Sequence, residues 1–139
     1  MENWQTSSTS KLSFRYPADF GTTYIHAQDW PPMFVIAATP YSCTEAGSET
    51  AQAGKTQKVV MDGQEYCRTL STEGAAGSVY KQYAYMTVQQ GKNVILTFTT
   101  REVQCGNYND NARTDCEAEH QYFNVDSVAA QILRTVQYK

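Results

Sequence analysis

The chain has 139 residues, of which 41% are hydrophobic and 18% charged, and its formal net charge is −3. This length and composition predict one globular domain over residues 1–139 and argue against a disordered chain. The acidic balance, with no basic patch, argues against nucleic acid as a partner. No apolar run reaches the ~18 residues that a membrane-spanning helix needs.

The first ten residues, MENWQTSSTS, are polar. They are predicted to form a flexible N-terminal segment, and they lack the apolar stretch of a signal peptide. If the protein is exported, we expect Met1 to start a form of the chain from which an upstream leader or membrane anchor has been removed.

The first predicted strand is KLSFRYP, residues 11–17. Leu12, Phe14 and Tyr16 lie at alternate positions, which is typical of a half-buried strand. Pro17 ends the strand because proline cannot donate to a ladder.

Residues 22–26 are predicted to form a second, short strand, and Trp-Pro-Pro at 30–32 is an extended break. MFVIAAT, residues 33–39, is a continuous apolar run of strand length, which predicts a central strand of a sheet. Residues 40–56 are small and polar, and they indicate a long loop.

Two hairpins and a connection between them follow. Asp62-Gly63 between two β-prone arms predicts a type I′ hairpin turn, because both central residues of that turn need positive φ. Residues 71–78 indicate a flexible connection. Gly91 predicts a second hairpin turn between VYKQYAYMTV and NVILTFTTREV.

An amphipathic helix is predicted at the end of the chain, and either Asn124 or Asp126 can cap its start. The apolar residues at helical spacing are Val125, Val128, Ala129, Ile132, Leu133 and Val136. The expected fold class is therefore α+β: an antiparallel sheet of about five to seven strands, with this C-terminal helix packed on one face.

The four cysteines allow three disulfide pairings. The chain has no CxxC motif, and its two histidines do not complete a zinc-ligand spacing. Disulfides are therefore the preferred use, which implies an oxidising compartment. Cys105 and Cys116 form the natural local pair, which leaves Cys43 to pair with Cys67.

The stretch CGNYNDNARTDC, residues 105–116, has two interpretations. Its asparagines alternate like the first ligands of a calcium loop, but the sixth and twelfth positions of that pattern are alanine instead of glycine and glutamate. Asn, Asp and Gly are also what a turn closed by a disulfide contains. The weak candidates for an irregular metal site are Asn107, Asn109, Asp110 and Asp115.

Catalytic residues are not evident. No G-x-S-x-G elbow is present, and disulfides would leave no thiol nucleophile. A Ser-His-Asp site that uses His26 or His120 remains open, because such residues meet in space and not in sequence. The favoured interpretation of His120, beside Glu117 and Glu119, is a solvated polar segment. The sequence predicts no catalytic residue, no metal and no cofactor.

Ten tyrosines suit the half-buried surfaces of a β-rich domain. Tyr83 and Tyr85 share one strand face. That face is core if the helix covers it, and an aromatic binding platform if it does not. The candidate binding surface comprises Trp30, Tyr83, Tyr85 and Tyr108.

Several segments over nearly the whole chain carry a resemblance: KLSFRYPADFGTTYI, DWPP, CTEAGSET, GQEYC, EGAAGSVYKQYAY, the CGNY stretch and FNVDSVAAQI. Together they resemble a type of exported bacterial protein, often lipid- or membrane-anchored, whose function is uncharacterised. The strand from Lys11 is also similar to the G-F-S-F-x-Y-P strand of the PsbP/Mog1-like fold, with Lys11 and Leu12 replacing glycine and phenylalanine. This resemblance implies an extracytoplasmic location and, by fold analogy, an accessory role beside a larger complex.

We therefore expect a non-enzymatic extracytoplasmic module, in the periplasm or at the cell surface, that binds a protein or a cell-wall component. The alternatives are a cell-envelope hydrolase that uses His26 or His120, and a calcium-dependent binding module that uses residues 105–116.

Overall fold

The computed structural model describes residues 3–139, so the expectation for Met1 lies outside the described residues. Nine strands, two α-helices and one 3-10 turn follow one another along this part of the chain. They are β1 (Trp4–Ser8), β2 (Leu12–Pro17), β3 (Ile25–Ala37), β4 (Ala46–Gly47), β5 (Lys55–Met61), β6 (Gln64–Ala75), β7 (Ser78–Gln89), β8 (Lys92–Val103), η1 (Cys105–Asn107), α1 (Asp110–Tyr122), α2 (Val125–Arg134) and β9 (Gln137–Tyr138).

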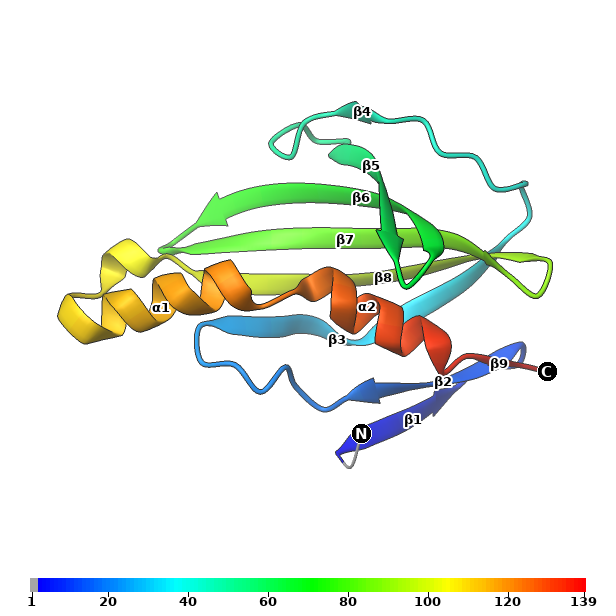
Figure 1. Ribbon diagram of the computed structural model, residues 1–139, viewed down its shortest axis with the longest axis horizontal. Coiled ribbons are helices and arrows are strands. Elements are labelled where there is room, and N and C mark those ends of the chain that lie inside the picture. Colours follow the sequence, from blue (N-terminus) through cyan, green and yellow to red (C-terminus); the bar gives the residue numbers. More distant parts are fainter. Residues whose placement is uncertain (1–2) are drawn as a thin grey trace.

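The strands form two antiparallel sheets, which confirms the α+β class (Figure 1). The large sheet has six strands in the order β3-β8-β7-β6-β5-β4, and the small sheet has the order β1-β2-β9. The sequence predicted one sheet and one helix, whereas the described chain has two of each. It also predicted a flexible segment over residues 1–10, where the structure has β1 paired with β2.

Tight turns join β5 to β8 into a continuous meander. Asp62 and Gly63 both have positive φ, at 52° and 78°, as the predicted I′ turn requires. Gln90 and Gly91, in the next turn, also both have positive φ, at 50° and 74°. The segment 71–78, predicted to be a flexible connection, belongs mostly to β6 and ends in a third such turn.

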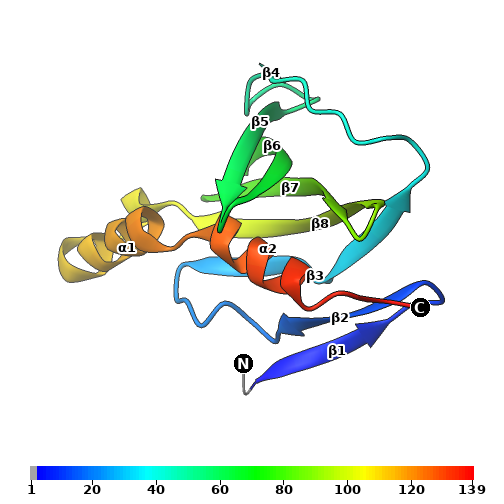
Figure 2. The same cartoon turned by 45° about the vertical axis from the view of Figure 1, so that its right-hand side comes forward.

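The hydrophobic core lies on one face of the large sheet, which we call the front face. Figure 1 shows α2 in front of this side, with α1 leading into it from beyond the end of the strands, and Figure 2 shows the small sheet below them. Leu12 and Phe14 of the small sheet join Ile132 and Leu133 of α2 in one buried cluster with the sheet. The sheet contributes Tyr66, Leu70, Tyr83, Tyr85, Val94, Leu96 and Phe98 to this cluster.

The helix α1 is held to the start of β3 by one side chain. The Glu119 carboxylate accepts hydrogen bonds from the backbone amides of Thr23, Tyr24 and Ile25 at 3.0, 2.6 and 2.9 Å. Backbone amides without another partner need such an acceptor. The residues around His120, which were interpreted as a solvated polar segment, form the end of α1, where Glu117 is exposed and Glu119 and His120 are half-buried.

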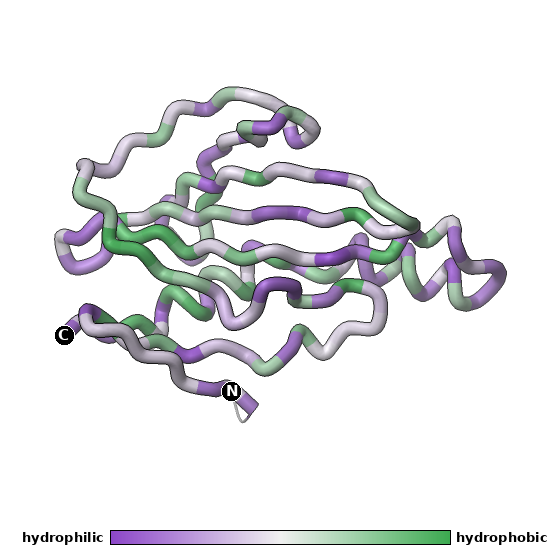
Figure 3. The backbone as a smooth tube through the Cα atoms, turned by 180° about the vertical axis from the view of Figure 1, so that it is seen from behind, coloured by the Kyte–Doolittle hydropathy of each residue, from purple (hydrophilic) through white to green (hydrophobic). Residues whose placement is uncertain are grey.

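The opposite face of the large sheet, the back face, carries no helix and no second sheet among the described residues. Figure 3 shows this side, with the strands toward the viewer and the helices behind them. The first five residues of the predicted central strand MFVIAAT, Met33 to Ala37, are the second half of β3, which is an edge strand that pairs only with β8. Met33 and Val35 of this strand are 65% and 52% exposed. The prediction of a central strand is therefore wrong.

A strap of irregular chain, residues 38–54, leads from β3 across to β5 at the far edge of the sheet (Figure 1). Among the described residues, no helix is long and apolar enough to span a membrane.

Candidate functional site

Both expected disulfides are present, Cys43–Cys67 and Cys105–Cys116, and the described chain has no free cysteine. The first one attaches the strap to β6, and the second one joins η1 to the middle of α1. Two disulfides in a chain of this size suggest an oxidising environment outside the cytoplasm.

The four aromatic residues of the predicted binding surface do not lie on one surface. Tyr83 and Tyr85 are only 6% and 1% exposed, and they pack in the core on the front face. Trp30 is half-buried and donates from Nε1 to the carbonyl oxygen of Pro17 at 2.8 Å. Tyr108 is half-buried with its ring centroid 5.4 Å from that of Tyr24. The aromatic-platform interpretation of Tyr83 and Tyr85 is therefore wrong.

The metal candidates of the 105–116 stretch do not converge either, because most of this stretch is helical. Asn107 donates from Nδ2 to the carbonyl oxygen of Gly77 at 2.9 Å, and Asn109 precedes the first residue of α1. Asp110 and Asp115 both lie on α1 and are exposed. Among the described residues, the one group of histidine, cysteine and carboxylate ligand atoms close enough to share a metal ion contains none of these four.

A polar layer lies between the helices and the front face of the sheet. Asp126 accepts a hydrogen bond from Tyr85 Oη at 2.5 Å and pairs with Arg68 Nη1 at 2.9 Å. Glu102 pairs with Lys81 Nζ at 3.0 Å. These groups border a cavity of about 340 Å³ at the junction of α1 and α2.

The two core tyrosines of this layer remain neutral. Burial raises the pKa of Tyr83 above 10.0, and the nearby carboxylates of Glu102 and Asp126 raise it further. Burial also raises the pKa of Tyr85, and Asp126, which accepts its hydrogen bond, acts in the same direction. Neither phenol is therefore an available base or nucleophile at ordinary pH.

The histidines do not form a catalytic pair with a hydroxyl group. His120 Nδ1 lies 3.8 Å from Glu102 Oε1, and its ring otherwise faces the sulfur atoms of Cys105 and Cys116. His26 lies in β3 opposite Arg101. Within residues 3–139, no serine or threonine hydroxyl donates to either ring, as a nucleophile beside its base would.

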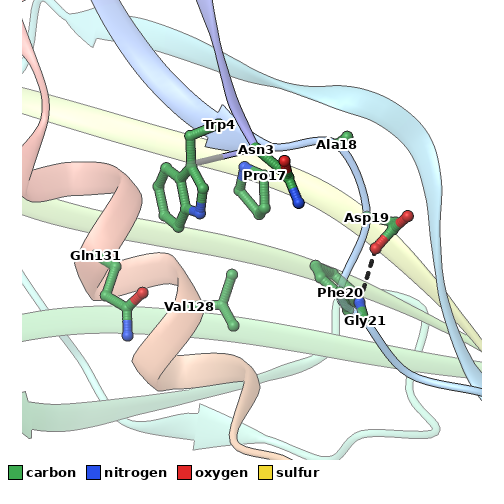
Figure 4. A pocket seen from close by; sticks show the side chains of 9 residues that line it. All are labelled: Asn3, Trp4, Pro17, Ala18, Asp19, Phe20, Gly21, Val128 and Gln131. Atoms are coloured by element: carbon green, nitrogen blue, oxygen red, sulfur yellow. Dashed lines mark hydrogen bonds between the residues drawn. The ribbon is translucent and has the colours of Figure 1, made fainter. Parts of the chain in front are cut away.

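One hollow, of about 690 Å³, lies between the small sheet and α2. Figure 4 shows Trp4 of β1 across from Val128 and Gln131 of α2, with Phe20 closing one side. Asp19 also lines this hollow, and its carboxylate accepts a hydrogen bond from the backbone amide of Gly21 at 2.8 Å. These walls can hold an apolar group, but they bring no reactive groups together.

The back face carries a longer depression, which we call the trough. It consists of two hollows of about 630 and 460 Å³ that share Gln52, Ser71 and Gln82 as lining residues. The strap forms one wall through Gln52 and Ala53. The floor comes from alternate residues of β3, β8, β7 and β6: Met33, Thr97, Thr99, Tyr80, Ala84 and Thr69.

Next to the trough, apolar side chains continue across the sheet. Val35 pairs with Ile95, and Ile95 pairs with Met86, so these three form one row on the back face. Val88, two residues further along β7, is 45% exposed. A contiguous apolar region on a protein surface is typical of a site that binds another molecule. The trough and this row together are the candidate site.

This site was not predictable from the sequence, because a continuous apolar run does not show which of its two faces is covered. The Trp-Pro-Pro break was the one feature of the sequence that indicated an edge strand here. It coincides with the register shift in β3 between Gln28 and Met33, a feature typical of edge strands.

No known family model, curated protein or solved structure matches this chain.

Proposed function

We propose that the protein is a non-enzymatic binding module that acts outside the cytoplasm and binds another protein through the back face of its large sheet. In this proposal the amphipathic helix α2 covers the front face and leaves the back face free. An upstream anchor in the periplasm or at the cell surface, and an accessory role beside a larger complex, agree with the resemblance to exported and PsbP-like proteins.

One observation carries the proposal: the apolar half of β3 is exposed where its composition favours burial. Met33 and Val35 are 65% and 52% exposed on the face that carries the trough. Removing apolar surface from water favours association and offsets part of its entropy cost. A partner that covers this face would supply the burial that the chain itself does not.

The lining of the site favours a protein over a glycan. Tyr80 lies in the smaller hollow, away from Met33. Tyr83 and Phe98 also line the larger hollow, but they are buried core residues, at 6% and 4% exposed. If the partner were a cell-wall glycan, exposed aromatic faces would be needed to stack on its sugars. Here the hydroxyl and amide groups of Thr97, Thr99 and Gln82 can bond to a peptide backbone, while Met33 and Val35 take apolar side chains.

A photo-crosslinking amino acid at position 35 tests the proposal in cells that express the protein. The control carries the same group at position 122, because Tyr122 is 77% exposed and lies on α1, outside the trough. We expect position 35 to crosslink one recurring protein and position 122 not to do so. Crosslinks to glycan, or the same set of proteins from both positions, would contradict the proposal.

The identified partner is then purified and its Kd is measured for Val35→Lys and for the matched control Tyr122→Lys. Both substitutions place the same charge on an exposed side chain, so folding should be equally unaffected. We expect Val35→Lys to weaken binding about tenfold or more, as loss of a buried anchor does. Equal affinity of the two variants for the partner would contradict binding through the back face.

A further inference from the structure

The Cys105–Cys116 disulfide has a histidine directly beside it. His120 Nε2 lies 3.8 Å from Cys116 Sγ and 3.9 Å from Cys105 Sγ. The ligand atoms of the three residues all lie within 4.8 Å of one another. Cys116 and His120 are four residues apart on α1, so they share one face of the helix.

These separations are close to those around a zinc ion. With zinc–sulfur and zinc–nitrogen bonds of about 2.3 and 2.0 Å, the nitrogen and sulfur atoms of a tetrahedral site lie about 3.5 Å apart, and two sulfur atoms about 3.8 Å apart. The distances of 3.8 and 3.9 Å from His120 Nε2 to the two sulfur atoms are within about 0.4 Å of that nitrogen–sulfur separation. Only the two sulfur atoms, which are bonded to each other, are too close, and breaking that bond would free them to separate.

We propose that Cys105, Cys116 and His120 form a zinc site when their disulfide is reduced, so that the same three side chains have an oxidised, metal-free state and a reduced, zinc-bound state. This inference is independent of the proposed binding function, because the site lies at α1 and outside the trough.

A dithiol reductant gives two electrons and two protons to the Cys105–Cys116 bond, becomes a disulfide itself and leaves two thiols. Zn²⁺ then binds to both sulfur atoms and to His120 Nε2, and the two thiol protons pass to solvent. Three protein ligands leave the fourth position for water.

Glu102 is placed to orient the histidine for this role. Its Oε1 lies 3.8 Å from His120 Nδ1, which is longer than a hydrogen bond, while its Oε2 pairs with Lys81 Nζ at 3.0 Å. In the zinc-bound state, a small approach of the two side chains would let this carboxylate accept from the Nδ1–H, which directs Nε2 toward the metal. Glu102 is therefore the positioning residue of this proposal.

Reductant and metal can reach the group. Cys105, His120 and Glu102 line an open hollow of about 590 Å³ beside α1. The buried Cys116 lies behind them and is not exposed. The other disulfide, Cys43–Cys67, has no histidine or carboxylate close enough to complete a site among the described residues, so it is a matched internal control.

The test compares cobalt and zinc binding by the whole protein before and after reduction with a phosphine, which binds zinc weakly. We expect the unreduced protein to bind neither ion. The reduced protein should bind one equivalent of zinc, and with cobalt it should show the thiolate-to-metal charge-transfer band. Under the same conditions Cys105→Ser/Cys116→Ser should lose both signals, whereas Cys43→Ser/Cys67→Ser should keep them.

Two single variants test the histidine and its carboxylate. His120→Ala should weaken zinc binding at least about tenfold, and Glu102→Gln about 10- to 100-fold, as loss of an outer carboxylate does. If reduction unfolds the protein, zinc should restore its far-UV circular dichroism spectrum, because binding and folding are then coupled. A charge-transfer band that survives in Cys105→Ser/Cys116→Ser, unchanged zinc affinity in His120→Ala, or no restoration by zinc would each overturn the proposal.

Discussion

At the scale of single residues, Asp126 connects the start of α2 to the sheet. Its carboxylate holds both Arg68 and the Tyr85 hydroxyl, and the Arg68 and Asp126 side chains are only 17% and 20% exposed. Asp126→Ala leaves two partly buried donors without their acceptor. We expect the free energy of unfolding to fall by about 3 kcal/mol, measured by urea denaturation.

An exposed ion pair provides the comparison for that variant. Arg134 pairs with Asp62 at 2.8 Å, but the two side chains are 55% and 69% exposed. Asp62 lies in a turn, so the variant to use is Arg134→Ala, which should cost less than about 1 kcal/mol. Similar losses in both variants would show that Asp126 has no special part in holding α2.

The raised pKa of Tyr83 predicts how the free energy of unfolding changes at alkaline pH. Its folded pKa is raised above 10.0 by burial, so between pH 10 and that raised pKa the unfolded chain has lost a proton that the folded protein retains. The stabilisation is complete below pH 10 and is lost as pH rises. Each such tyrosine lowers the free energy of unfolding by about 1.4 kcal/mol per pH unit in this range.

Urea denaturation at pH 9, 10 and 11 (about one unit below the onset to about one above) checks this prediction. Tyr83→Phe removes one titrating group, so its stability should fall less steeply above pH 10 than that of the unsubstituted protein. Parallel slopes for the two proteins would mean that Tyr83 does not contribute to alkaline unfolding.

At the scale of elements, the strap over residues 38–54 depends on a few fixed points. Cys43–Cys67 ties it to β6, and the amide of Thr72 donates to the carbonyl oxygen of Glu49 at 2.6 Å. Gly47 has φ of 84°, and a Cβ atom there would lie only 2.2 Å from the carbonyl oxygen of Gly54. The strap therefore forms the wall of the trough only while these contacts hold it.

Cys43→Ser/Cys67→Ser should release the strap. On the chain-entropy model, opening this loop lowers the free energy of unfolding by about 3.5 kcal/mol. We expect limited proteolysis to cut within residues 38–54 first, and affinity for the back-face partner to fall. In Cys105→Ser/Cys116→Ser, which loses about 3 kcal/mol on the same model, faster amide exchange should instead appear in α1.

One turn and the helix α2 were predictable from the sequence, whereas the helix α1 was not. The turn at Asp62-Gly63 was predictable because backbone sterics restrict positive φ to few residue types. The helix α2 was predictable from its apolar spacing. In contrast, α1 has a single buried residue, Cys116, so it carries no apolar stripe to recognise. Its position depends on Glu119 and on the disulfide, which are contacts between distant segments.

At the scale of the whole molecule, the small sheet joins the beginning of the chain to its end. β2 lies between β1 and β9, and Trp4 packs against the main hydrophobic cluster. The polar composition of β1 gave no sign of a strand, because β1 is stabilised by pairing with β2 and by the packing of Trp4. The candidate site escaped prediction for a related reason: exposure is a property of the assembled sheet, not of the residues in β3.

Removal of residues 1–9 therefore tests the assembled fold. A flexible segment could be lost without effect, whereas loss of β1 removes a ladder and the partly buried ring of Trp4. We expect a cost of about 2 kcal/mol, which corresponds to a Tm lower by several degrees in a domain of this size. Calorimetry of the shortened and full-length chains distinguishes a flexible segment from a stabilising strand. An unchanged Tm would mean that β1 adds nothing to stability.

The arrangement of the small sheet also determines how the molecule responds to a mechanical load. β1 begins opposite Pro17 at one end of β2, and β9 ends opposite Leu12 at the other. A force that pulls the two chain ends apart would act along these strands. Antiparallel ladder bonds lie across the strands, so they would bear the load together, in shear. A protein tethered at one end and loaded at the other would resist at this sheet before the large sheet is strained.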